Sequence, residues 1–205
     1  MSEDSYDFEA GDLSLDFANT SNWHASEHPE ESLHSYSDLL AWGKAAGLLS
    51  PELAHRLTRL AQEHPDVAER AFHAAIQTRE AIYRIFSNRH AGKPVSDKDL
   101  FELNALVHEA IPHRQLVPID DHFRWEWKPE GREPDLILWE VAFAATELLT
   151  SDKVGWVREC EDDRGCGYLF LDLSKNHSRR WCSMESCGNR AKARRHYSRS
   201  KLDKE

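Results

Sequence analysis

The first 159 residues of this 205-residue chain contain no cysteine, and no run of residues is long and apolar enough to span a bilayer. The most apolar run, residues 136–149, is interrupted by Glu140 and Glu147. The acidic N-terminus lacks the basic and apolar regions of a signal peptide, so we expect a cytoplasmic protein without membrane contact. The GxSxG, P-loop and GxGxxG motifs are absent too, and we expect no enzyme.

All four cysteines lie in the C-terminal quarter, as the pairs Cys160–Cys166 and Cys182–Cys187. Clustered thiolates in a reducing compartment are typical of a zinc site, with two disulfides or unconnected thiols as the alternatives. Four protein ligands leave no position for water, so we predict one structural Zn²⁺. A module of about 45 residues buries too little apolar surface to fold alone, so we expect it to unfold without metal.

Charge is distributed unevenly along the chain. The formal net charge of −10 would by itself oppose binding to nucleic acid. Residues 1–150 hold 13 basic and 27 acidic residues, a net charge of −14, whereas residues 151–205 hold 13 and 9, a net charge of +4. Within residues 173–201, nine basic residues accompany one acidic residue, Glu185. This asymmetry indicates that the C-terminal part meets a polyanion, and we predict DNA.

Most of these cations lie on a helix predicted from Cys187 to Arg199. Such a helix can dock on phosphates and place arginines against guanine edges, and a solvated basic helix end is the alternative. Trp181 is expected in the small core of the module, with the two arginines before it divided between phosphate contact and packing. The candidate nucleic-acid-binding residues are Arg179, Arg180, Arg190, Lys192, Arg194, Arg195 and Arg199.

Apolar periodicity predicts a mainly α fold with a small β component. The predicted helices are residues 37–46, a segment beginning at Pro51 after the cap Ser50, and residues 65–88, 97–107 and 135–149. Alternation at Leu13, Leu15 and Phe17 predicts a short strand or extended segment, and the pattern of residues 115–128 predicts a hairpin or two short strands. A second hairpin is expected between residues 168–173 and 179–183, which with the last helix gives a treble-clef-like ββα finger.

The sequences CGYLFLDLS from Cys166, RRWCSM from Arg179 and CGNRAK from Cys187 resemble the CGNR zinc finger. The resemblance implies that Cys160, Cys166, Cys182 and Cys187 are the zinc ligands. It also implies a bacterial transcription regulator whose finger binds DNA.

The sequences LSLDFANT from Leu13, DLLAW from Asp38 and REAIYR from Arg79 resemble the ABATE domain that usually precedes this finger. We therefore predict an acidic helical sensor domain at residues 8–150 and a finger at 154–200. The candidate ligand-binding residues are Asp16, Asn19, Thr20 and Arg79. The alternative for these four is a structural polar network that includes an Arg79–Asp16 pair.

The leading hypothesis is a transcription regulator whose finger binds DNA and whose first domain senses an unknown small molecule. A homodimer would present two fingers to two half-sites. Two other functions stay open, a structural or protein-interaction module and an RNA-binding module. Competition by RNA and self-association of the chain are the observations that separate them.

Overall fold

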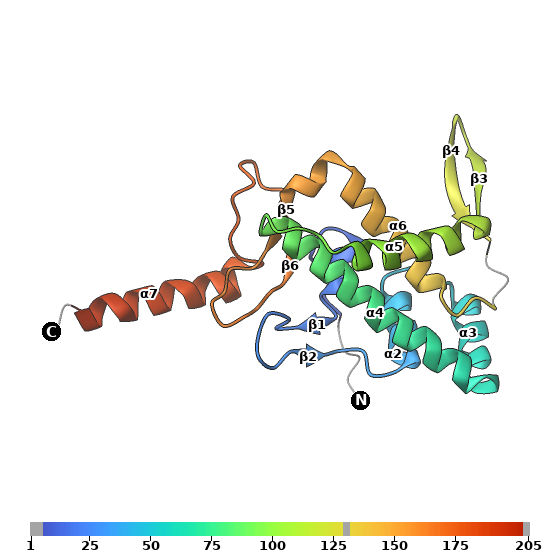
Figure 1. The fold of residues 1–205 in the computed structure, drawn as a ribbon, viewed down its shortest axis with the longest axis horizontal. Coiled ribbons are helices and arrows are strands. Elements are labelled where there is room, and N and C mark those ends of the chain that lie inside the picture. Colours follow the sequence, from blue (N-terminus) through green and yellow to red (C-terminus); the bar gives the residue numbers. More distant parts are fainter. Residues whose placement is uncertain (1–5, 129–131, 203–205) are drawn as a thin grey trace.

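The computed structural model describes residues 6–128 and 132–202, and for residues 196 and 198–202 the backbone alone. Within these ranges the protein is mainly helical, with three small antiparallel sheets (Figure 1), as the sequence predicts. No helix in the described part of the chain is both long and apolar enough to cross a membrane.

Six α-helices in the described ranges build the first domain. They are α1 (Leu13–Ala18), α2 (Tyr36–Ala45), α3 (Pro51–Glu63), α4 (Pro65–His90), α5 (Asp97–Ala110) and α6 (Leu136–Thr150). Two hairpins accompany them, β1 (Ser21–Asn22) with β2 (Glu30–Glu31) and β3 (Arg114–Ile119) with β4 (His122–Trp127). The C-terminal part holds β5 (Val157–Glu159), β6 (Leu169–Leu171), a π turn (Met184–Gly188) and α7 (Asn189–Leu202). Short 3-10 turns at Ile111–His113 and Asp152–Trp156 connect elements.

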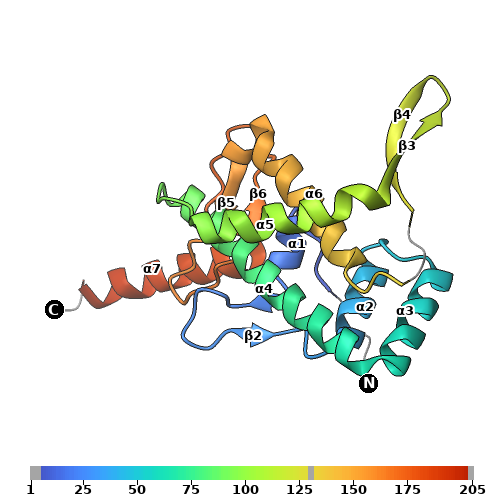
Figure 2. The ribbon, with the colours of Figure 1, turned by 45° about the vertical axis from the view of Figure 1, so that its right-hand side comes forward.

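The predicted helices are confirmed, and local signals place their ends. Ser50 caps α3, since its hydroxyl accepts a hydrogen bond from the Leu53 N–H at 3.2 Å, and Pro51 occupies the first turn. Gly47, with a φ of +76°, ends the turn after α2. The long helix α4 runs beside α5 through the middle of the domain, and α2 and α3 pack at its N-terminal end (Figure 2).

The predicted strand over residues 13–17 is wrong, because this segment is the helix α1. Asp12 caps it by accepting a hydrogen bond from the Ser14 N–H at 2.9 Å. The helix is enclosed between α4 and α6, and its residues 14–18 are all buried. A six-residue helix buried on all sides gives no helical periodicity, so the alternation of Leu15 and Phe17 with polar residues carried no information about strand structure.

The predicted hairpin at residues 115–128 is confirmed as β3–β4, but the second predicted hairpin is wrong. Strand β6 pairs with β5, with Val157 opposite Leu171 and Glu159 opposite Leu169. Residues 179–183 form no strand. The loop between β5 and β6 turns tightly enough to bring its two flanking segments together, and this pairing leaves residues 179–183 as a loop.

The C-terminal part is not separate from the first domain. Val157, Leu169 and Leu171 are buried in the same apolar core as the helices α1, α4 and α6. The Leu171 N–H also donates a hydrogen bond to the Ala10 carbonyl at 2.7 Å. The strands β5 and β6 are therefore held by both the C-terminal module and the helical domain.

Candidate metal centre and nucleic-acid interface

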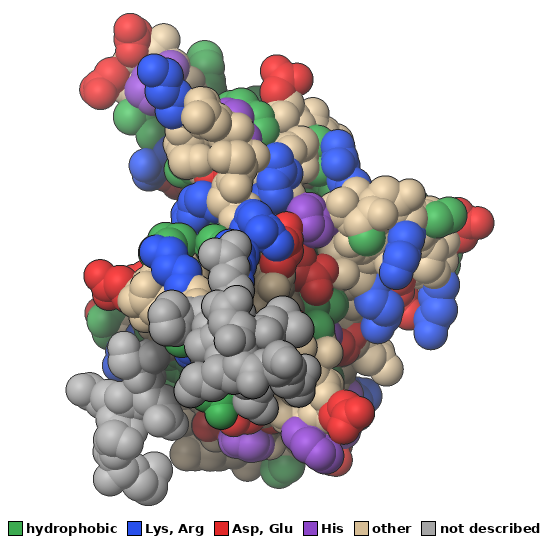
Figure 3. All heavy atoms as spheres, turned by 90° about the vertical axis from the view of Figure 1, so that its left-hand side faces the viewer, with side chains coloured by type: hydrophobic (Ala, Val, Ile, Leu, Met, Phe, Trp, Pro, Cys, Tyr) green, Lys and Arg blue, Asp and Glu red, His purple; other side chains and the backbone are tan. Residues whose placement is uncertain are grey.

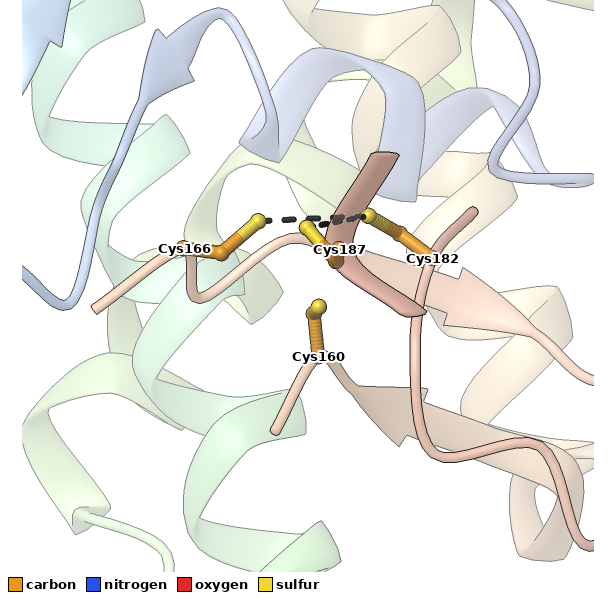
Figure 4. A group of neighbouring side chains, drawn as sticks. All are labelled: Cys160, Cys166, Cys182 and Cys187. Atoms are coloured by element: carbon orange, nitrogen blue, oxygen red, sulfur yellow. Dashed lines mark hydrogen bonds between the residues drawn. The ribbon is translucent and has the colours of Figure 1, made fainter. Parts of the chain in front are cut away.

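The four cysteines converge on one point (Figure 4), with all their sulfur atoms within 4.8 Å of one another. The Cys166 and Cys182 sulfurs are 3.9 Å apart, and those of Cys182 and Cys187 are 3.6 Å apart. In a tetrahedron with Zn–S bonds of 2.3 Å the sulfurs lie about 3.8 Å apart. A disulfide requires about 2.05 Å. All four cysteines are free, so the donor set fits one tetrahedral Zn²⁺.

Backbone turns rather than long elements position these ligands. Cys160 directly follows β5 and Cys166 precedes β6, so residues 160–168 form a loop that we call the knuckle. Gly165 and Gly167 take φ values of +85° and +64°, where only glycine fits without strain. Cys182 lies in a loop and Cys187 in the π turn that leads into α7, so the base of α7 is fixed by the metal site.

The thiols strongly influence one another's ionisation. Hydrogen bonds from Cys166 and Cys182 lower the pKa of Cys160, and the same contacts with Cys160 raise the pKa of Cys166 and of Cys182. Burial raises the pKa of Cys187. One thiolate is thus stabilised by its neighbours' protons. Four thiolates need a cation among them, and zinc binding here should release protons.

Asp162 in the knuckle organises several of the predicted arginines. Its buried carboxylate accepts hydrogen bonds from Arg164, Arg190 and Arg194 at 3.2–3.3 Å. Although burial raises it, these hydrogen bonds, first of all from Arg164, hold the pKa of Asp162 well below its usual range. Arg190 also donates to the Cys187 sulfur at 2.8 Å. Sequence reasoning did not single out Asp162, since nothing in its spacing distinguishes it from other acidic residues.

Two further candidates are engaged in the loop before the second cysteine pair. Arg179 donates to the Cys182 carbonyl at 2.6 Å, and its guanidinium lies over the Phe170 ring, 4.6 Å from its centre. Arg180 pairs with Glu161 at 2.5 Å and lies over the Trp181 ring. Trp181 itself packs against the small core around the cysteines, as expected. Through these contacts the two arginines stabilise the loop that carries Cys182.

Lys192 and Arg195 are different, since both are exposed and neither makes an ion pair with the residues that the structure describes. They lie on α7, which extends away from the body (Figure 1). Seen towards that end of the molecule, the face carries many Lys and Arg side chains, with Asp and Glu among them (Figure 3). The side chain of Arg199 lies outside the described residues.

The profile of the ABATE family, described as "Putative stress-induced transcription regulator", matches residues 11–152. The profile of the CGNR zinc finger matches residues 157–200. The chain belongs to the ABATE family. Its clustered cysteines are those of a CGNR finger and are suited to one structural zinc ion. A comparison with curated proteins found no match.

The ABATE domain contains a cavity of about 350 Å³ between α1, α2 and the β1–β2 hairpin, which we call the ABATE cavity. Three of the four predicted ligand-binding residues line it, namely Asp16, Asn19 and Thr20. Arg79 is not among its lining residues. It reaches the cavity wall through two lining residues, pairing with Glu31 and donating to the Thr20 hydroxyl at 3.4 Å.

The predicted pair between Arg79 and Asp16 is wrong. Arg79 is buried on α4 and donates to the two Glu31 oxygens at 2.5 and 2.7 Å, and to Glu80 at 3.0 Å. Burial lowers the pKa of Arg79, but the contacts with Glu31 outweigh this and raise it. The guanidinium faces the β1–β2 hairpin, so it fixes the hairpin to α4 and leaves Asp16 without this partner.

Asp16 is 7 % exposed, and its Oδ1 accepts a hydrogen bond from the Ala10 N–H at 2.9 Å. Burial raises its pKa to about 6, and the charges of Asp7 and Asp12 add to the effect. It forms no ion pair within the described residues. Asp16 is therefore a buried acid without a cation, on the wall of a cavity.

Asn19 connects the same cavity to the finger. Its side-chain amide donates to the Leu169 carbonyl at 2.8 Å, and its Oδ1 accepts from the Leu169 N–H at 2.9 Å. The side chain thus pairs with β6 as a neighbouring strand would. Both groups are buried, so Asn19 has a structural role, in line with the alternative of a polar network, although its partner Leu169 was not predicted.

Proposed function

We propose that this protein is a zinc-dependent, DNA-binding transcription regulator, and that its ABATE domain senses a small molecule. One observation carries the DNA-binding half. The helix α7 begins next to the zinc ligand Cys187 and extends away from the body, and its exposed Lys192 and Arg195 form no ion pair with the described residues. Family membership supports the regulatory half.

The helix has suitable dimensions and charge for this task. Its 14 residues span about 21 Å, and a B-DNA major groove of about 12 Å width admits an α-helix. Lys192 and Arg195 are three positions apart and share a face. Arg190 and Arg194, which are held by Asp162 in the knuckle, give α7 a fixed base. The net charge of −14 on residues 1–150 repels DNA from the rest of the chain and so directs it to this helix.

The test is fluorescence anisotropy of the zinc-loaded chain with duplex DNA across a salt series. Two double variants are compared. The α7 variant carries Lys192→Glu and Arg195→Glu, and the control variant carries Arg56→Glu and Arg59→Glu. The control pair is exposed on α3, at the opposite end of the molecule, and changes the net charge equally. The α7 variant should weaken binding and reduce the log–log salt slope by about 2, since each phosphate contact contributes about 0.9.

Equal loss of binding in both variants would mean a non-specific charge effect and would contradict the proposal. Tight zinc binding without DNA binding at low salt would contradict it as well. Stronger competition by single-stranded or A-form RNA than by duplex DNA would favour the RNA-binding alternative. Self-association that is lost in the α7 variant would favour contact between α7 and the acidic domain of a second copy.

A further inference from the structure

We propose that the ABATE cavity binds a small organic cation, an ammonium or guanidinium compound, with Asp16 as its counter-ion, and that residues 19–26 transmit its presence to the zinc finger. The inference rests on the sensing half of the proposed function. It does not depend on whether the finger binds DNA.

The charged residues in the cavity lining are acidic, apart from one histidine, His34. Asp7, Asp16, Glu31 and Asp38 contribute to this lining, and neither lysine nor arginine does. All four accept at least one hydrogen bond, and within the described residues Glu31 alone of the four is paired with a cation. Arg79 pairs with Glu31, the His34 N–H and the Ser35 hydroxyl donate to Asp38, and the Glu9 N–H donates to Asp7. The carboxylates would repel an anionic ligand and attract a cationic one, so the cavity favours ligands with a positive charge.

Asp16 is the most informative of the four acids. It is more than nine-tenths buried, and within the described residues its Oδ2 has no hydrogen-bond donor and neither oxygen has a cation. A buried carboxylate without a counter-charge is costly, and a cation that enters the cavity would remove this cost. Tyr6 and Trp42 also line the cavity and give a cation an aromatic wall.

The arrangement favours an organic cation over a metal ion. Among the described residues, the four cysteines form the one group of His, Cys, Asp and Glu side chains close enough to hold a metal. The cavity carboxylates are too dispersed for this. A volume of about 350 Å³ exceeds the needs of a single ion and falls within the range of small-molecule sites.

Residues 19–26 join this cavity to the finger, and we call them the linking segment. Asn19 and Thr20 line the cavity at its start, and Asn19 holds β6. Three residues later the Trp23 ring lies under two guanidinium groups, with Arg164 at 4.8 Å and Arg190 at 5.3 Å from its centre. The segment thus touches both the cavity and the arginines around Asp162.

The end of the linking segment packs directly on the knuckle. A Cβ built on Gly165 would lie 2.6 Å from the Ser26 Cα, and one on Gly167 would lie 2.7 Å from the Ala25 nitrogen. The two backbones are therefore in close contact. A cation that orders residues 19 and 20 must also bias this contact, and through Arg190 the base of α7. By linkage, any ligand of α7 affects the cation equally.

The test is calorimetric titration of the zinc-loaded full chain with butane-1,4-diamine and with agmatine. Butane-1,4-diol and succinate are the uncharged and anionic counterparts. We expect saturable binding of the cations, none of the diol or succinate, and at least about tenfold weaker cation binding in Asp16→Asn. Asp66→Asn removes an exposed acid on α4 that is not part of the cavity, and should leave binding unchanged.

Hydrogen exchange on the same samples tests the transmission. Amides of residues 19–26 and 160–168 should gain protection when butane-1,4-diamine binds the wild type. No saturable cation binding, equal binding of the diol, or undiminished binding in a folded Asp16→Asn protein would overturn the ligand assignment. Cation binding without a change at residues 160–168 would overturn the transmission. DNA binding is measured separately, so its absence would remove the proposed DNA function and leave the cation site standing.

Discussion

The substitution Asp16→Asn should stabilise the protein in the absence of ligand, and more so at higher pH. Asparagine keeps the shape of the side chain and an Oδ1 that accepts from the Ala10 N–H. It removes the negative charge of a residue that is only 7 % exposed and that has no cation beside it within the described residues. A site that carries an uncompensated charge reduces stability, and removing the charge should recover it.

The magnitude follows from the pKa of Asp16, which burial raises from 3.8 to about 6. The folded protein holds the proton over a pH range where the unfolded chain has lost it. The free energy of unfolding therefore falls as pH rises from about 4 to about 6, and it stays lower above that. At 1.36 kcal/mol for each pKa unit, the full loss is about 3 kcal/mol. About 1.4 kcal/mol of it falls between about pH 5 and about pH 8.

Thermal unfolding of both zinc-loaded proteins at several pH values measures this effect. The Tm of Asp16→Asn minus that of wild type should rise by about 3–6 °C between about pH 5 and about pH 8. Zinc release and the histidines remote from Asp16 affect both proteins and cancel in the difference. The charged or titratable groups that face Asp16 are Asp7, Asp12 and Tyr168, together with the cavity residues Glu31, His34 and Asp38.

A difference in Tm that does not vary with pH would refute the reasoning, because a buried charge must produce a pH-dependent term. A variant that becomes relatively less stable as pH rises would show that the Asp16 carboxylate is stabilised by a cation. A constant offset added to the pH-dependent difference would reflect the new amide group, so the change of the difference with pH is the deciding quantity.

Three further outcomes are expected for the finger and its contact with the ABATE domain. Cys182→Ser should lower bound zinc from one per chain towards none under chelator concentrations that leave the wild type loaded, as measured by atomic emission. Gly167→Ala should lower the free energy of unfolding by about 2–4 kcal/mol in denaturant titration, because the φ of Gly167 is +64° and a Cβ would lie 2.7 Å from backbone. The control Gly47→Ala should lower it by about 1 kcal/mol, because Gly47 has a φ of +76° but no atom within 4 Å of a Cβ. Asn19→Leu should leave both backbone groups of Leu169 unpaired, cost about 2–5 kcal/mol and speed hydrogen exchange at β6.

Local signals in the sequence predicted the helices well. The cap Ser50, Pro51 at the first turn and the glycine after α2 act within a few residues, so they can be recognised without knowledge of the fold. Long-range features were less accessible. Helix α1 was taken for a strand because its burial on all sides comes from α4 and α6, and the pairing of β5 with β6 depends on the closure of the knuckle.

The candidate site shows the same division. The four cysteines converge as their types and clustering indicated. The candidate nucleic-acid-binding residues were selected from the sequence by their positive charge. Charge alone does not distinguish a side chain that is paired with Asp162 from one that is exposed. Arg190 and Arg194 belong to the first kind, Lys192 and Arg195 to the second. This distinction depends on one carboxylate that the fold brings to the base of α7.

The shared core implies that zinc and the ABATE domain stabilise each other. Val157, Leu169 and Leu171 are buried against the helical domain, while the loop that joins their strands supplies Cys160 and Cys166. Loss of zinc would release the knuckle and, with it, the partner of Asn19 and the ring contacts of Trp23. The cavity wall would then lose its support from the finger. Zinc occupancy should accordingly affect cation binding, although the metal and the cavity share no residue.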